Sequence, residues 1–145
     1  MIDPHPATLL RHVAGSLQWP YEIQFTLRQP GHGPLELTWL VAFPQQFSGY
    51  AGPGLCVIPA DMDQDEQTNA LGTIVREVHD KVLAEAERVG WAQEVARQMK
   101  VRLPDPKFRA YIEALRQQDG ENVTYMDMTI EQSQRWLERI NQYSA

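Results

Sequence analysis

The clearest pattern in the chain is a strict alternation of apolar and polar residues over residues 21–28. Every odd position there is apolar and every even position is polar, which is typical of a strand with one buried and one exposed face. Residues 35–43 repeat the apolar odd positions, and their even positions become apolar at Leu40 and Ala42. We therefore predict two strands joined by a hairpin, the second of them covered on both faces at its far end.

Two shorter elements accompany these strands. Residues 55–58 are an apolar run that follows a loop rich in glycine and proline, so we expect a third strand and an antiparallel meander. Residues 7–17 carry leucine and valine at helical spacings, which predicts a short N-terminal helix that ends before Pro20.

The pattern becomes helical after Asp61 and stays mostly helical to the end of the chain. Residues 66–89 place their apolar side chains on one stripe, which predicts an amphipathic helix. We expect Gly90 to end or kink this helix, and residues 91–100 to form another helical segment.

The remaining residues carry the signals that begin and end helices. Asp105 is suited to cap a helix that Gly120 closes, and Thr129 with Gln132 forms a capping box before a final amphipathic helix. Residues 123–128 between these two helices have an extended pattern that would add a fourth strand.

Together these elements predict an α+β fold. It consists of an N-terminal helix, an antiparallel meander of three or four strands, and a mostly helical C-terminal half packed on the sheet. A chain of 145 residues is large enough for one core and contains no long linker, so we predict a single domain over residues 1–145.

Composition narrows the class of protein. The chain has 13 basic and 19 acidic side chains, a net charge of −6, so it gains little from counterion release on nucleic acid. No apolar run approaches membrane-spanning length and the N-terminus does not resemble a signal peptide, so we expect a cytoplasmic protein without membrane contact. Cys56 is the single cysteine, which excludes an internal disulfide framework.

No motif predicts catalysis, a metal or a cofactor. Residues 61–66 alternate acids as a calcium loop does, but Glu66 and Gly72 replace the glycine and glutamate that such a loop needs. We interpret these acids as favourable charges at a helix N-terminus. His79 is interpreted as a partly exposed helix residue and Cys56 as a small buried side chain; an enzyme that uses His79 with a carboxylate is the residual alternative.

One segment departs from the acidic average. Residues 97–116 have a local net charge of +4, with Phe108 and Tyr111 interleaved among the cations. Such a segment can bind an acidic protein segment or single-stranded nucleic acid. The helical spacing also allows a plainer interpretation, in which the cations form a solvated face and both aromatic rings point into the core.

The order of helix, three strands and helix in a small acidic chain is loosely similar to the export chaperones of type III secretion. The similarity covers the first 90 residues; those proteins then return to strands, whereas this chain continues in helices. The resemblance implies a dimer that binds unfolded segments of a client protein, and it assigns no residues.

We therefore predict a non-enzymatic interaction module, such as an adaptor, a regulator or a chaperone-like protein. We expect a homodimer joined through residues 66–89 or through the C-terminal helix. The alternative is a nucleic-acid-associated accessory protein that uses residues 97–116. The predicted partner-binding residues are Arg97, Lys100, Arg102, Lys107, Arg109, Arg116, Trp136 and Tyr143.

Overall fold

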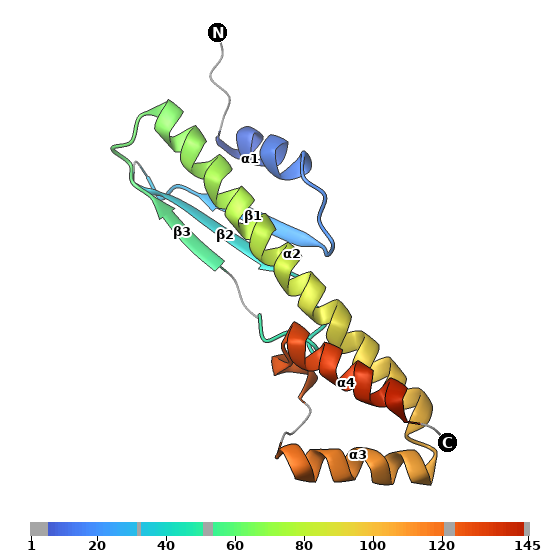
Figure 1. Ribbon diagram of the computed structural model, residues 1–145. Helices are drawn as coiled ribbons and strands as arrows, with labels where there is room; N and C mark the ends of the chain where they lie inside the picture. Colours follow the sequence, from blue (N-terminus) through green and yellow to red (C-terminus); the bar gives the residue numbers. More distant parts are fainter. Residues whose placement is uncertain (1–5, 32, 51–53, 121–123, 144–145) are drawn as a thin grey trace. The chain divides into compact units, whose positions relative to one another are not determined.

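The computed structural model describes residues 6–31, 33–50, 54–120 and 124–143 (Figure 1). It has the predicted α+β architecture, with an N-terminal helix, a three-stranded antiparallel meander and a helical C-terminal half. In chain order the elements are α1 (Pro6–Gly15), β1 (Ile23–Arg28), β2 (Leu35–Val41), β3 (Gly54–Ile58), α2 (Gln64–Arg102), α3 (Pro106–Asp119), the 3-10 helix η1 (Tyr125–Asp127) and α4 (Ile130–Gln142).

The chain divides into two compact units. The first comprises residues 1–42 and 51–84, and the second comprises residues 43–50 and 85–145. The helix α2 contributes its N-terminal part to the first unit and its C-terminal part to the second. The single domain expected from the sequence stays a prediction.

The first unit contains the sheet, whose strands follow one another in the order β1-β2-β3 with both pairs antiparallel. Ile23 lies opposite Val41 in the first pair, and Leu37 lies opposite Cys56 in the second. The polar even positions of β1 are exposed and its apolar odd positions are half-buried, as the alternation predicts. Gly31 has a φ of 59° in the hairpin between β1 and β2, a conformation that glycine adopts without strain.

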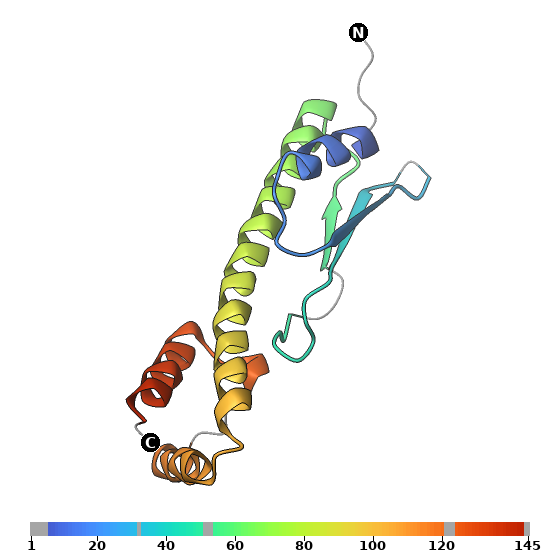
Figure 2. The ribbon, with the colours of Figure 1, turned by 90° about the vertical axis from the view of Figure 1, so that its right-hand side faces the viewer.

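Both α1 and α2 cover the same face of this sheet, and no described helix of the first unit covers the other face (Figure 2). Leu10 of α1, Leu37 of β2 and Val75 of α2 are buried together in the core of the first unit. The prediction that β2 is covered on both faces at its far end is wrong, because Leu40 is 51% exposed and Ala42 is exposed as well. We call the uncovered side the outer face of the sheet.

The helix α2 runs for 39 residues, so it does not end at Gly90, and residues 91–100 continue it instead of forming a separate segment. Glycine costs a helix roughly 1 kcal/mol relative to alanine. Here Val89 and Ala92 on either side are fully buried, and their packing outweighs that cost. Among the described helices, none is long and apolar enough to cross a membrane.

The second unit has a core of its own. The buried side chains of α3 and α4 pack there with Val95 and Met99 of α2, rather than on the sheet. Asp105 caps α3 and Gly120 closes it with a φ of 66°, and Thr129 forms the predicted capping box of α4. The fourth strand is not formed by the described residues, because η1 occupies most of that segment; residue 123 lies outside them.

Candidate interaction surfaces

The cations at the two ends of the basic segment are paired within their own helices. Nη2 of Arg97 lies 2.6 Å from Oε1 of Glu94, and Nη1 of Arg116 lies 3.3 Å from Oε1 of Glu113. Hydrogen bonds from Arg97 are the largest cause that lowers the pKa of Glu94 to about 2, and the same contact raises the pKa of Arg97. Both ends of the segment are therefore largely neutralised.

The two arginines in the middle of the segment donate to backbone carbonyls instead of carboxylates. Nη1 of Arg102 lies 3.0 Å from the carbonyl oxygen of Ile140, at the C-terminal end of α4. Nε and Nη2 of Arg109 lie 3.2 and 3.1 Å from the carbonyl oxygen of Leu103. A carbonyl fixes the guanidinium in place but does not cancel its charge.

These arginines belong to what we call the α2–α3 corner, residues 100–109. Among the described residues, the exposed ammonium groups of Lys100 and Lys107 have no hydrogen-bond or ion-pair partner. Asp105 is the single acid of the corner, and it already accepts hydrogen bonds from the backbone N–H of Lys107 at 3.0 Å and from the Tyr143 hydroxyl at 3.3 Å. With four cations and one acid, the corner has a net charge of +3.

A pocket of about 340 Å³ opens at this corner and is lined by Val101, Arg102, Asp105, Phe108 and Tyr143. Val101 is 67% exposed, more than any other large apolar side chain among the described residues. The centroid of the Tyr143 ring lies 5.2 Å from that of the Phe108 ring. Burial, followed by the neighbouring charge of Asp105, raises the pKa of the Tyr143 hydroxyl, so it stays protonated and can donate. The pocket lining thus combines apolar and aromatic side chains with one cation, Arg102, and one acid, Asp105.

The other predicted aromatic contacts are taken up by the core. Trp136 is 1% exposed and packs in the cluster of the second unit, so its side chain is not available to a partner in this fold. Phe108 is fully buried although it lines the pocket, and the Tyr111 hydroxyl donates to the carbonyl oxygen of Arg139 at 2.9 Å. The plainer interpretation of the aromatic residues, that they point inward, is confirmed.

A second surface lies on the outer face of the sheet, where sequence reasoning expected none. Leu55 and Val57 of β3 are 63% and 52% exposed, and Leu40 of β2 is exposed on the same face. Residues 55–58 are a continuous apolar run, so the sequence does not say which of their side chains the helices cover. Cys56 is half-buried on the covered face.

The residues that suggested chemistry have structural roles. Nε2 of His79 donates to the carbonyl oxygen of Gln18 at 2.7 Å, and its ring packs edge-on to Trp19 at 4.8 Å. Oδ1 of Asp63 accepts from the backbone N–H of Glu66 at 2.8 Å, so the acidic cluster caps α2 as interpreted. Repulsion between the carboxylates of this cluster raises the pKa of Glu66, and Asp63 contributes most. Within the described part of the chain, no three His, Cys, Asp or Glu side chains are arranged to hold a metal.

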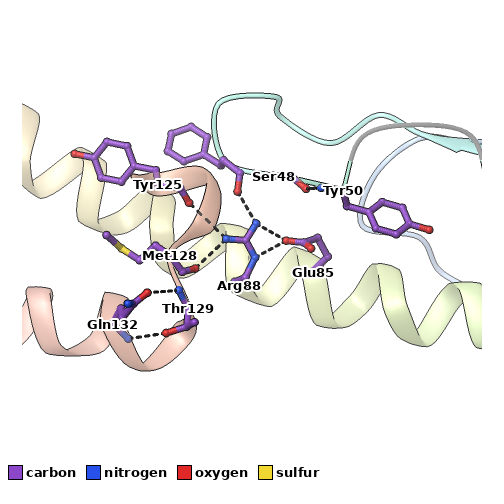
Figure 3. Close-up of polar contacts among 9 residues, drawn as sticks. Ser48, Tyr50, Glu85, Arg88, Tyr125, Met128, Thr129 and Gln132 are labelled. Atoms are coloured by element: carbon purple, nitrogen blue, oxygen red, sulfur yellow. Dashed lines mark hydrogen bonds and ion pairs between the residues drawn. The ribbon is translucent and has the colours of Figure 1, made fainter. Parts of the chain in front are cut away.

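Sequence reasoning missed Arg88, which organises the second unit (Figure 3). Its guanidinium pairs with Glu85 at 2.5 Å and donates to the carbonyl oxygens of Phe47 at 2.8 Å and Met128 at 2.9 Å, with a longer contact to that of Tyr125. One arginine thereby ties the 43–50 segment and η1 to α2. It therefore supports the fold of this unit rather than a binding surface.

No protein-family model, curated protein or solved structure matches this chain. Function is therefore inferred from the residues of the α2–α3 corner and of the sheet alone.

Proposed function

We propose that this chain is a non-enzymatic, cytoplasmic protein-interaction module that binds an acidic segment of a partner protein at the α2–α3 corner. The observation that carries the proposal is the exposed Val101, which lines a pocket together with Arg102 at a corner of the chain that has a net charge of +3. Exposed apolar groups rimmed by charge are typical of interaction sites.

The pocket suggests how such a segment would bind. One apolar side chain of the partner would enter the pocket against Val101 and Phe108, where it loses contact with water. Carboxylates on either side of it would meet the ammonium groups of Lys100 and Lys107, which can reorient on their flexible stems. Arg102 is already held by a carbonyl, so it presents a fixed charge at the pocket wall.

The surroundings favour a protein partner over single-stranded nucleic acid. Binding to single strands depends on exposed aromatic rings on which the bases stack. Phe108 is buried and Tyr111 is half-buried with its hydroxyl engaged, so neither offers a free ring face of the kind that stacking needs. The net charge of the whole chain also repels a polyphosphate outside the corner.

Fluorescence anisotropy with three labelled probes tests the proposal. The first probe is a peptide of alternating glutamate and leucine, the second replaces leucine by serine, and the third is a single-stranded oligothymidine. We expect the first probe to bind and both Lys107→Glu and Val101→Asp to weaken it by about tenfold or more. Lys81→Glu is the matched control, because it makes the same charge change at an exposed lysine of α2 outside the corner.

Each outcome is informative. Equal binding of the leucine and serine peptides would remove the pocket from the proposal, and equal effects of Lys81→Glu and Lys107→Glu would remove the corner. Absence of peptide binding at low salt would overturn the proposal as a whole. Binding of the oligothymidine alone, with a steep loss of affinity as salt is raised, would support the nucleic-acid alternative.

A further inference from the structure

The strand β3 forms an edge of the sheet. Among the described residues, β2 is the only strand that pairs with it, so one row of its backbone N–H and C=O groups is left open. Proteins commonly protect such edges with charged side chains, prolines or bulges, because an open edge is a template for another strand. No charged side chain or proline lies within Gly54–Ile58.

The absence of charge extends well beyond the strand. No charged residue and no histidine occurs between Glu36 and Asp61. The opposite edge differs, because β1 ends in Arg28 and presents only polar side chains on its outer face, with Glu22 just before it. Of the two edges, only β3 is uncharged and apolar on its outer face.

The side chains of β3 make it a ready-formed template. Ile58 is 2% exposed and packs in the core of the first unit, so the strand is held in place from its covered face. Leu55 and Val57 point the other way and are more than half exposed. A strand ordered in this manner loses little conformational entropy when a second strand pairs with it.

We infer that the partner of β3 is the same strand of a second copy of this chain, paired antiparallel about a two-fold axis near Cys56. Antiparallel pairing of identical strands is self-complementary, so the assembly closes as a dimer with one continuous six-stranded sheet. Cys56 is the middle residue of the strand, so Leu55 of one copy lies beside Val57 of the other. Across the axis each residue of β3 then meets an uncharged residue of the other copy, while Glu36 of β2 lies opposite Val57 within each copy.

This surface differs from those that the sequence suggested for dimerisation. The apolar stripe of residues 66–89 packs largely within the first unit, and Trp136 and Ile140 of α4 pack within the second. Their burial leaves little of either stripe for a second copy. The proposed β3 dimer does not depend on the binding of acidic segments at the α2–α3 corner.

Sedimentation velocity over a concentration series tests the dimer. We expect the unmodified chain to dimerise reversibly and Val57→Lys to raise the dissociation constant by about tenfold or more, since it places two ammonium groups near the axis. Leu83→Lys on α2 is the matched control, an exposed apolar residue of the same unit, and should leave the dimer intact. Leu40→Lys distinguishes pairing at the edge of the sheet from stacking of two sheets face to face. It should have little effect on a dimer formed by edge pairing but would disrupt a dimer formed by stacking.

Amide hydrogen exchange on the unmodified chain gives a second, independent readout. The alternate amides of β3 that point away from β2 should be protected at high concentration and exchange rapidly at low concentration. A chain that is monomeric throughout the series would overturn the inference, as would a dimer that Val57→Lys does not weaken or one whose β3 amides exchange equally at both concentrations. Lys107→Glu should leave dimerisation unchanged, so failure at the corner and failure at β3 can be distinguished.

Discussion

Replacement of Arg88 by alanine should destabilise the second unit far more than its surface charge suggests. The side chain is 18% exposed and reaches two chain segments besides its own helix. Arg88→Ala removes the donor from the carbonyl oxygens of Phe47 and Met128 and leaves the carboxylate of Glu85, which is 20% exposed, without its partner. The perturbation is therefore the loss of a cation that joins three segments of the chain.

The magnitude follows from these contacts. The two short bonds, at 2.8 and 2.9 Å, are made by a charged donor, and such bonds contribute about 1.5–3 kcal/mol each. Freeing the arginine side chain returns up to about 2 kcal/mol of rotamer entropy. We expect the free energy of unfolding to fall by about 3 kcal/mol, with the contact to Tyr125 at 3.4 Å adding little.

Urea unfolding followed by circular dichroism and tryptophan fluorescence measures this change, and Arg97→Ala is its control. Arg97 lies on the same helix and pairs with a glutamate three residues earlier, as Arg88 does, but it is 62% exposed. Because solvent screens an exposed pair of this kind, Arg97→Ala should lower the free energy of unfolding far less than Arg88→Ala does. If the two variants differ by less than about 1 kcal/mol, the carbonyl contacts of Arg88 are not what stabilises the unit. Faster amide exchange in residues 43–50 of Arg88→Ala would locate the effect.

Three further predictions concern local features of the helices. Thr129→Ala removes the capping box of α4 and should lower the midpoint of thermal unfolding, with a cost of about 1 kcal/mol that Thr129→Ser largely restores. Titration by NMR should give Glu94 a pKa of about 2 instead of 4.5. The stabilisation from its pairing with Arg97 is therefore complete above pH 4.5 and is lost as the pH falls toward 2. Arg97→Gln should raise the pKa of Glu94. Gly120→Ala should destabilise the chain by about 1 kcal/mol, because Gly120 has a φ of 66°. Gly90→Ala should stabilise the chain by up to about 1 kcal/mol, because Gly90 lies within α2 with open space around it. Urea unfolding should therefore show changes of opposite sign in the free energy of unfolding of the two variants.

Local rules predicted much of this fold because they depend on neighbours in the sequence. The alternation over β1 and the capping residues Asp105 and Thr129 act within a few positions of themselves, and the structure confirms them. Gly90 and Leu40 were predicted wrongly for one common reason. Each depends on which surface a distant element covers, and tertiary packing overrides the local signal there.

The candidate surfaces were predictable to a similar extent. The sequence located the basic segment, and even the pairing of Arg97 follows from a glutamate three positions earlier. Only the fold brings Arg102 to a carbonyl oxygen 38 residues away and Arg88 to carbonyl oxygens about 40 residues away. The exposure of Leu55 could not be predicted either, because an apolar strand reads the same whether one or both of its faces are covered.

The two proposed surfaces should respond differently to salt, and this follows from how charge is divided along the chain. The first unit has four basic and nine acidic side chains, a net charge of −5, and the uncharged β3 is its proposed contact. Two copies therefore repel each other at long range. Salt shortens the screening length from about 30 Å at 0.01 M to about 10 Å at 0.1 M, so dimerisation should strengthen or stay constant as salt is added.

The α2–α3 corner, with a net charge of +3, should behave in the reverse way, because salt screens its attraction to an acidic segment. One salt series, with sedimentation for the dimer and anisotropy for the peptide, therefore separates the two surfaces without any substitution. Dimerisation that weakens steeply with salt would indicate that the corner of one copy binds the acids of another. In that case β3 would not be the contact, and Lys107→Glu rather than Val57→Lys would dissociate the dimer.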